Sequence, residues 1–281
     1  MKPTRIRLLA LDIDGTLLRS DKTLGPRTRT ALERARAAGV RVVLVTGRRY
    51  PSARRVAEEL GGDVPLVLHN GALVVERGRV LRCRPLARET ARRTIAIGRE
   101  AGMEPVLHCG AEGEGLLLVA AAAPRSGLVG YYLERAGEEV RTVADLGSAL
   151  EAQVAIQVMF GGTRDETDPL RARLELTLAG SARVERTVYP ASGLVLLDVV
   201  DPGVGKAEAL AFVQRHWGID GQQTLAIGDN WNDREMVAAA GLGFVMGNAD
   251  PELLALGLPV LPTNDEDGVA WAIEQHVLAG A

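Results

Sequence analysis

Short apolar segments alternate with helical segments at both ends of the chain, and this alternation constrains the fold more than any other feature. Before residue 72, buried strands are predicted over 6–13, 41–46 and 64–71, and helices over 26–38 and 50–60. After residue 200, strands are predicted over 224–228 and 242–247, and helices over 205–217, 230–239 and 250–256. Such alternation is typical of an α/β fold in which helices cover both faces of a parallel sheet.

The middle of the chain follows a different pattern. A hairpin over 73–83 turns at Gly78, and beyond it helices are predicted over 86–101 and 167–178. Strands are predicted around 116–123, 154–160, 182–188 and 194–199. We therefore expect an α+β cap domain over 85–189, inserted into a core formed by 1–84 and 190–281. A domain joined to its core by two crossings can move against it as a lid.

Two carboxylates stand at the carboxyl end of the first predicted strand. Asp12 and Asp14 stand one residue apart after the apolar run 8–11, and Gly15 and Thr16 come next. One explanation is a simple turn, since Asp and Gly are common turn residues. The pair alone does not decide between this explanation and a functional one. The functional explanation is that a divalent cation offsets the repulsion between the carboxylates. Asp12 could then attack phosphorus, and Asp14 could act as general acid and base.

Polar groups also stand at the carboxyl ends of other predicted strands, where open parallel sheets bind their ligands. Thr46 ends the second strand, with Gly47 and Arg48 after it. Asn70 and Gly71 end the third, and GDNWND (228–233) begins at the last residue of the strand over 224–228. Turns and helix caps explain some of these residues. A hydroxyl with free backbone N–H groups could instead hold phosphate oxygens. The carboxylate of Asp229 could share Mg²⁺ with Asp12 from a separate strand.

Lys206 is one of only three lysines in the chain, whereas almost all its positively charged side chains are arginines. It opens a predicted helix, where a positive charge is unfavourable for the helix dipole. An ammonium group that offsets aspartate charge and holds phosphate would explain its position. The arginine pairs at 48–49, 54–55 and 92–93 are interpreted as solvated helix faces, and the four histidines show no metal-ligand spacing.

In chain order, the motifs DxDGT, TGR, a lysine and GDNxND resemble those of the haloacid dehalogenase superfamily of phosphatases. The insertion, the step over 70–72, the GDNWND form and the segments 247–250 and 263–273 resemble its Cof-type branch. The resemblance covers about 1–84 and 190–281, and it implies a Rossmann-like core with an inserted cap. One departure is that Gly205 and Ala207 flank Lys206, where the family commonly has a small polar residue before the lysine and glycine after it.

The resemblance also implies a role for each motif residue. Asp12 would be the nucleophile that forms an aspartyl-phosphate, and Asp14 would be the general acid and base. Mg²⁺ would be held by the carboxylates of Asp12 and Asp229 and by the backbone carbonyl of Asp14. The transferring phosphate would be bound by Thr46, Gly47, Lys206 and Asn232, with Asp233 supporting the loop and the lysine. Dehalogenase and phosphonatase branches lack a carboxylate at the position of Asp14, so its presence favours phosphoester hydrolysis.

The sequence therefore predicts a Mg²⁺-dependent phosphatase for a small phosphomonoester, and the resemblance favours a sugar phosphate. A phosphomutase and a phosphatase for a nucleotide- or vitamin-like phosphate are alternatives, because the cap decides which leaving group fits. A more remote alternative is a non-catalytic sensor on the same fold. Such a protein would lack an essential group, and none is missing here.

Composition limits the partners. The net charge of −3 argues against a nucleic-acid footprint and against a polybasic membrane surface. No apolar run approaches the ~20 residues of a membrane span, and no signal peptide is recognised at the N-terminus. The two cysteines match no metal spacing. We expect a reduced, cytoplasmic protein whose partner is a small phosphorylated metabolite, and the sequence does not predict its oligomeric state.

Overall fold

The computed structural model describes residues 5–121, 123, 127–189 and 192–279. The chain divides into two compact units. The first, called the core unit below, comprises Met1–Arg48, Ser52–Gly78 and Gly205–Ala281, and the second, called the inserted unit, comprises Arg49–Pro51 and Arg79–Val204. Within the described parts of both units, no helix has the length and apolar character needed to cross a membrane.

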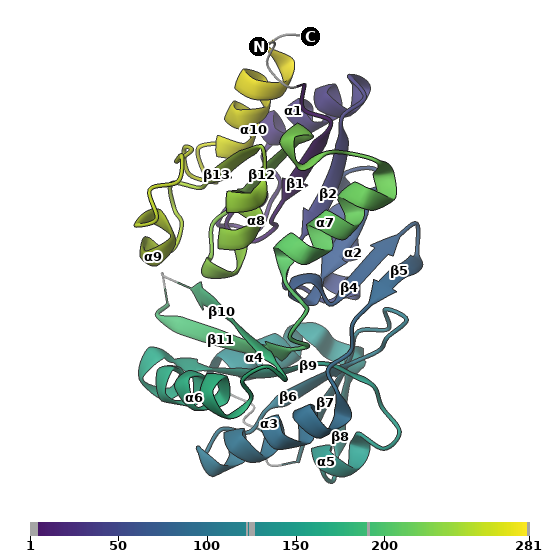
Figure 1. The fold of residues 1–281 in the computed structure, drawn as a ribbon, viewed down its shortest axis with the longest axis vertical. Coiled ribbons are helices and arrows are strands. Elements are labelled where there is room, and N and C mark those ends of the chain that lie inside the picture. The colour runs from purple at the N-terminus through teal and green to yellow at the C-terminus, as the bar shows by residue number, and fades with distance from the viewer. Residues whose placement is uncertain (1–4, 122, 124–126, 190–191, 280–281) are drawn as a thin grey trace. The chain divides into compact units, whose positions relative to one another are not determined.

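The core unit is built on a seven-stranded sheet in the order β13-β12-β1-β2-β3-β4-β5 (Figure 1). Six of its strands belong to the core unit: β1 (Leu8–Leu11), β2 (Arg41–Val45), β3 (Leu66–Leu68), β4 (Leu73–Glu76), β12 (Thr224–Gly228) and β13 (Leu242–Val245). The seventh, the edge strand β5 (Arg79–Cys83), falls among the residues assigned to the inserted unit. The strands from β13 to β3 pair in parallel, whereas β4 is antiparallel to β3. The α/β fold class predicted from the alternating pattern is confirmed.

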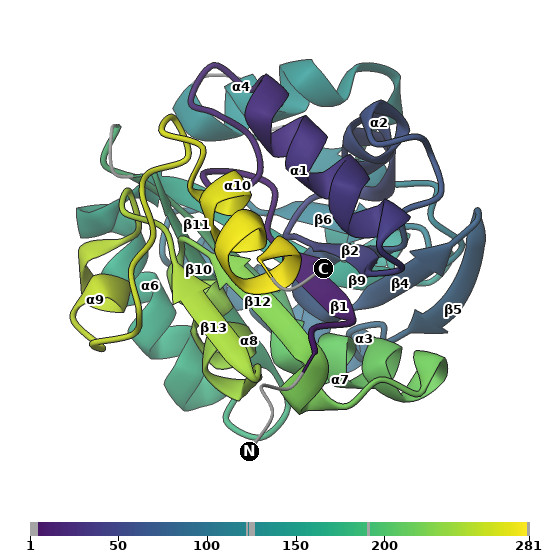
Figure 2. The same cartoon turned by 90° about the horizontal axis from the view of Figure 1, so that it is seen from above.

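Helices cover both faces of this sheet. They are α1 (Pro26–Ala37), α2 (Tyr50–Glu59), α7 (Lys206–Trp217), α8 (Arg234–Ala239), α9 (Pro251–Leu254) and α10 (Gly268–Ile273). Helix α1 packs against α10 on one side, and α7 packs against α8 on the other (Figure 2). In α1 the buried side chains recur at helical spacing, as expected for a helix with one face on a core: Thr28, Ala31, Leu32 and Ala35.

The register of the parallel strands brings their carboxyl ends to one level. Leu11, the last residue of β1, lies opposite Leu44 of β2 and Ile227 of β12. The segments that follow these three strands therefore leave the sheet along the same edge. This is the edge at which the sequence places its candidate site residues.

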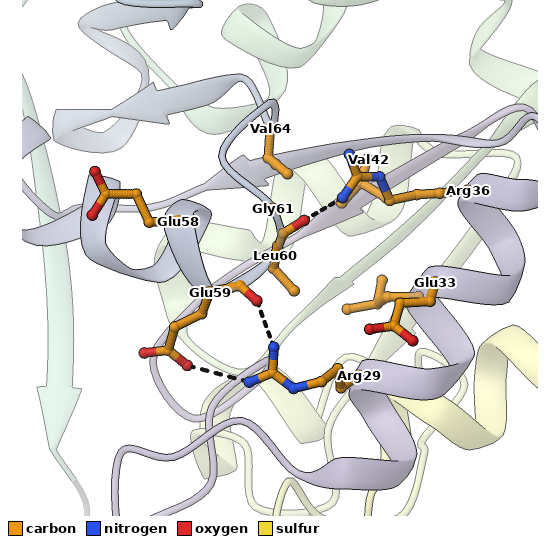
Figure 3. A pocket seen from close by; sticks show the side chains of 10 residues that line it. Arg29, Glu33, Arg36, Val42, Glu58, Glu59, Leu60, Gly61 and Val64 are labelled. Atoms are coloured by element: carbon orange, nitrogen blue, oxygen red, sulfur yellow. Dashed lines mark hydrogen bonds and ion pairs between the residues drawn. The ribbon is translucent and has the colours of Figure 1, made fainter.

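A pocket of about 320 Å³ lies between α1 and the end of α2, beside Val42 near the start of β2 (Figure 3). Two arginines of α1 cross it to the carbonyl oxygens that end α2. Arg29 donates to the carbonyl of Glu59 at 2.5 Å, and Arg36 donates to the carbonyl of Leu60. Positive groups at a helix C-terminus satisfy its last carbonyls and its dipole. The two arginines in the lining of this pocket are explained by helix capping.

The inserted unit has its own six-stranded sheet, in the order β10-β11-β9-β6-β7-β8. Its elements are α3 (Arg88–Glu100), β6 (Val106–Cys109), β7 (Leu116–Ala120), α4 (Gly127–Ala136), β8 (Val140–Val143), α5 (Leu146–Ala149), β9 (Ala155–Thr163), α6 (Arg164–Thr177), β10 (Arg183–Tyr189) and β11 (Leu194–Val200). The pairings are antiparallel except between β7 and β8. Two separate clusters of buried side chains pack against this sheet, one including α3 and α6 and the other α4.

The end of the inserted unit lies later in the chain than the predicted position near 189. Strand β11 pairs with β10 and β9 in the second sheet, and it pairs with no strand of the core sheet among the described residues. We therefore propose that the inserted domain extends to about residue 204. Residues 69–71, predicted to continue the third strand, instead form a tight turn in which all three residues have positive φ values.

Candidate active site

Lys206 links two aspartates that come from different strand ends. Its Nζ donates to Asp12 Oδ1 and to Asp233 Oδ1, both at 2.6 Å, and all three side chains are buried. Burial acts to lower the pKa of Lys206, but the charges of the two aspartates outweigh it and raise that pKa. The ammonium therefore stays charged, and it offsets part of the negative charge gathered at this edge.

Asp229 completes a buried group of three carboxylates. One oxygen from each of Asp12, Asp229 and Asp233 lies within 4.8 Å of the others. Thr16 donates its hydroxyl to Asp229 Oδ1 at 2.7 Å. Gly15 has a φ of +78°, and a Cβ added there would lie 2.3 Å from Asp229 Oδ2. A residue without a side chain is therefore needed where the first loop passes Asp229.

The charges of this group are only partly compensated. Burial, with a contribution from Asp233 and against the effect of Lys206, raises the pKa of Asp12 to about 7. Burial and the charge of Asp12 also raise the pKa of Asp229 well above its usual value. Both shifts mean that the ionised carboxylates are short of positive charge in the protein alone.

The three carboxylates differ in what they have left to offer a cation. Asp233 uses Oδ1 for Lys206, and its Oδ2 accepts backbone N–H groups from Asp229 and Asn230 at 3.2 and 3.1 Å. Asp12 and Asp229 are thus the better ligands, and the hard oxygen donors fit Mg²⁺.

Asp14 lies at the same edge but in a different environment. Arg48 grips it through Nε to Oδ2 at 2.6 Å and Nη2 to Oδ1 at 2.7 Å, and Lys22 Nζ adds a contact at 3.1 Å. Burial acts to raise the pKa of Asp14, but the hydrogen bonds and charge of Arg48, with help from Lys22, lower it to about 2. Asp14 is therefore ionised in this arrangement.

The arginine pair at 48–49 was interpreted wrongly as a solvated helix face. Arg48 precedes α2 and holds Asp14, with 21% of its side chain exposed. Arg49 is only 5% exposed. Charge pairing with Asp14 explains why Arg48 turns inward.

The remaining predicted residues lie around this cluster. Thr46 is buried directly after β2, and its hydroxyl accepts the N–H of Arg48 at 3.1 Å. Asn232 is also buried, and its Nδ2 donates to Asn70 Oδ1 at 2.9 Å. The sequence assigns no role to Asn70 or Thr16, although Thr16 is the last residue of the DxDGT motif and Asn70 begins the step over 70–72.

Comparison with known proteins gives a consistent result. A family model described as haloacid dehalogenase-like hydrolase matches residues 9–273. The chain is 30% identical over 259 residues to the HMP-PP phosphatase of Klebsiella pneumoniae, covering 89% of this chain and 87% of the relative. It is 24% identical over 282 residues to the 5-amino-6-(5-phospho-D-ribitylamino)uracil phosphatase of Escherichia coli, covering 96% of each.

Solved structures share the fold across nearly the whole chain. A haloacid dehalogenase-like hydrolase from Bacteroides thetaiotaomicron superposes with a TM-score of 0.77 at 27% identity, covering 96% of this chain and 99% of the other. A protein from Streptococcus mutans reaches a TM-score of 0.81 at 20% identity, covering 97% and 99%. The second likeness shows the fold alone.

Proposed function

The chain belongs to the haloacid dehalogenase-like hydrolases, and from this premise we propose that Asp12 is the nucleophile of its phosphatase reaction. The enzyme is a phosphoric monoester hydrolase, as its phosphatase relatives indicate. The proposal rests chiefly on one observation, the buried contact of Lys206 with Asp12 beside Asp229. A lysine and a metal-compatible carboxylate flanking another carboxylate are what phosphoryl transfer to that carboxylate requires.

In the proposed first step, an oxygen of Asp12 attacks phosphorus and the bond from phosphorus to the leaving oxygen breaks. Lys206 holds Asp12 Oδ1, so Oδ2 is the candidate attacking atom. Asp14 gives the leaving oxygen a proton. In the second step, Asp14 takes a proton from water, which attacks phosphorus and releases phosphate from Asp12.

The pKa of about 2 sets a condition on Asp14. An acid held at that value cannot donate a proton near neutral pH. The hydrogen bonds of Asp14 with Arg48 and Lys22 must therefore break before Asp14 acts as the acid. The contacts with the two basic residues belong to a resting arrangement in this proposal.

Thr46, Gly47, Lys206 and Asn232 are the proposed ligands of the phosphate oxygens. Mg²⁺ held by the carboxylates of Asp12 and Asp229 and the backbone carbonyl of Asp14 would supply positive charge to the phosphate and to the carboxylates. The raised pKa values of Asp12 and Asp229 support a cation in this place.

The substrate is proposed to be a small phosphorylated metabolite. The Escherichia coli relative is named for a molecule with both a phosphorylated ribityl chain and a uracil ring. A sugar phosphate and a nucleotide- or vitamin-like phosphate therefore both remain within the proposal. A cytoplasmic location also remains part of it, and the free state of Cys83 and Cys109 supports a reduced protein.

A phosphate-release assay tests the function directly. With an aryl phosphate as substrate, we expect release of inorganic phosphate that EDTA removes and Mg²⁺ restores. Ca²⁺ should restore it less well, because Ca²⁺ prefers more ligands and looser geometry. Full activity in metal-free protein would refute the metal assignment, and conversion of a sugar phosphate to its isomer without phosphate release would identify a mutase.

Thermal stability tests the metal site without using activity. The folded-state pKa of Asp12 lies above the value of about 3.9 in an unfolded chain, so its stabilising contribution is present below about pH 4 and is lost as pH rises to about 7. Mg²⁺ replaces the missing positive charge, and protons compete with it. We expect saturating Mg²⁺ to raise Tm by about 5–10 °C at pH near 8, and by less at pH near 5.5.

Two variants control this measurement. Asp229→Asn removes a proposed ligand and should abolish most of the Mg²⁺-dependent rise in Tm. Asp21→Asn makes the same chemical change at an exposed carboxylate that bonds to Thr23, and it should leave the rise intact. An equal rise in both variants would mean that the cation binds elsewhere.

A further inference from the structure

The turn between β3 and β4 has an unusual backbone for its position. His69, Asn70 and Gly71 have φ values of 50°, 56° and 109°, and all three residues are buried. Two successive residues with side chains in the left-handed region are uncommon. Such conformations persist only when the surroundings fix them, and they gather at functional sites.

The backbone of this turn contacts two of the segments that carry the proposed phosphate ligands. The N–H of Asn70 donates to the carbonyl of Thr46 at 3.1 Å. Gly71 lies against the residue before Lys206, since a Cβ added to it would be 2.3 Å from the carbonyl oxygen of Gly205. The left-handed φ and this close approach both require glycine at position 71.

The side chain of Asn70 reaches a third segment. Its Oδ1 accepts a hydrogen bond of 2.9 Å from Nδ2 of Asn232, which is 162 residues away in the chain. The same oxygen lies 3.1 Å from the place where a Cβ on Gly47 would be. Both amides are buried, with 1% of Asn70 and 6% of Asn232 exposed.

We propose that Asn70 is a positioning residue that fixes the amide of Asn232, and through it the place of the transferring phosphate. This inference rests on the proposed phosphate-binding role of Asn232. Asparagine suits the position for two reasons: it tolerates the left-handed backbone, and it accepts a hydrogen bond without adding charge. A carboxylate in its place would add negative charge beside a site that already holds three aspartates.

Replacement of Asn70 by glycine tests the inference, because glycine keeps the left-handed backbone and removes only the amide. We expect kcat for an aryl phosphate to fall by roughly 10- to 100-fold, since small misplacement of a reacting group has effects of this size. KM should change much less. Asn70→Ala lacks the same amide. If its melting curve shows that it remains folded, its kcat should fall by a similar factor.

The decisive comparison uses Asn232→Ala as a second background. If Asn70 acts through Asn232, then Asn70→Gly should lower kcat by less than about 3-fold when Asn232 is already alanine. Arg77→Gly is the matched control, since Arg77 is also left-handed (φ 50°) but lies in the turn between β4 and β5, where it pairs with Asp63. This control should keep the activity of the parent protein.

Each other outcome overturns a specific statement. An equal loss from Asn70→Gly in both backgrounds would show that Asn70 does not act through Asn232. Full activity in Asn70→Gly, with a loss only in Asn70→Ala, would assign the effect to the backbone and refute positioning by the amide. Full activity in Asn232→Ala would remove the proposed role of Asn232 itself, and with it this inference, while leaving the roles of Asp12 and Asp14 untouched.

Discussion

Asp12→Asn is expected to stop phosphate release while the protein stays folded. An amide has nearly the shape of the carboxylate, but it cannot attack phosphorus. We expect kcat to fall by at least about 10⁴-fold, as for the loss of other enzymic nucleophiles. The raised pKa of Asp12 means that a neutral group is well tolerated in this place, so Tm in EDTA should not fall.

The control for this change is Asp21→Asn, an identical substitution in the same loop at an exposed residue. It should retain the activity of the parent protein. Phosphate release at the parent rate by verified Asp12→Asn protein would rule out Asp12 as the nucleophile. A large fall in Tm would instead show that the carboxylate is needed for folding, through its contact with Lys206.

Asp14→Asn is expected to have an effect that depends on the leaving group. For an alkyl phosphate, whose leaving oxygen needs a proton, kcat/KM should fall by about 10²–10⁴-fold. For a nitrophenyl phosphate, whose leaving group departs without a proton, kcat/KM should fall much less. Hydrolysis of the phosphorylated enzyme also needs Asp14, so a burst of nitrophenolate should precede slow turnover.

Steady-state rates with the two esters and a rapid-mixing experiment check this expectation. A general disturbance of the site would lower kcat/KM for both esters alike, so a larger loss for the alkyl ester than for the aryl ester is specific to proton transfer by Asp14. Equal losses of kcat/KM for both esters, without a burst, would show that Asp14 supports the site instead of transferring protons.

Much of the core could be predicted because its pattern is regular. The strand over 224–228 was predicted with the bounds that β12 has, and α1 and α7 differ from prediction by one residue at an end. Fewer elements of the inserted unit could be predicted. Helix α4 contains two glycines, β8 is a four-residue strand with no buried residue, and β6 carries a buried histidine, so none of them shows the expected periodicity.

The candidate site was predictable only in part, because its members meet through the fold. The motifs singled out Asp12, Lys206 and Asp229 by resemblance. The level ends of β1 and β12 explain why Asp12 and Asp229 meet, and Lys206 reaches Asp12 from the first residue of α7. Nothing in the spacing indicates that Arg48 turns toward Asp14. The contact of Asn70 with Asn232 depends on a left-handed turn that sequence periodicity does not describe.

The central claim is that the phosphoryl group is transferred to Asp12. The most direct test is to mix Asp14→Asn protein with nitrophenyl phosphate and Mg²⁺, quench in acid and measure the intact mass. We expect most molecules to gain the mass of one phosphoryl group, located on the peptide that contains Asp12. A double variant that carries both Asp14→Asn and Asp12→Asn should show no gain in mass. Release of nitrophenolate without any gain in mass, or a phosphoryl group on another residue, would contradict the claim.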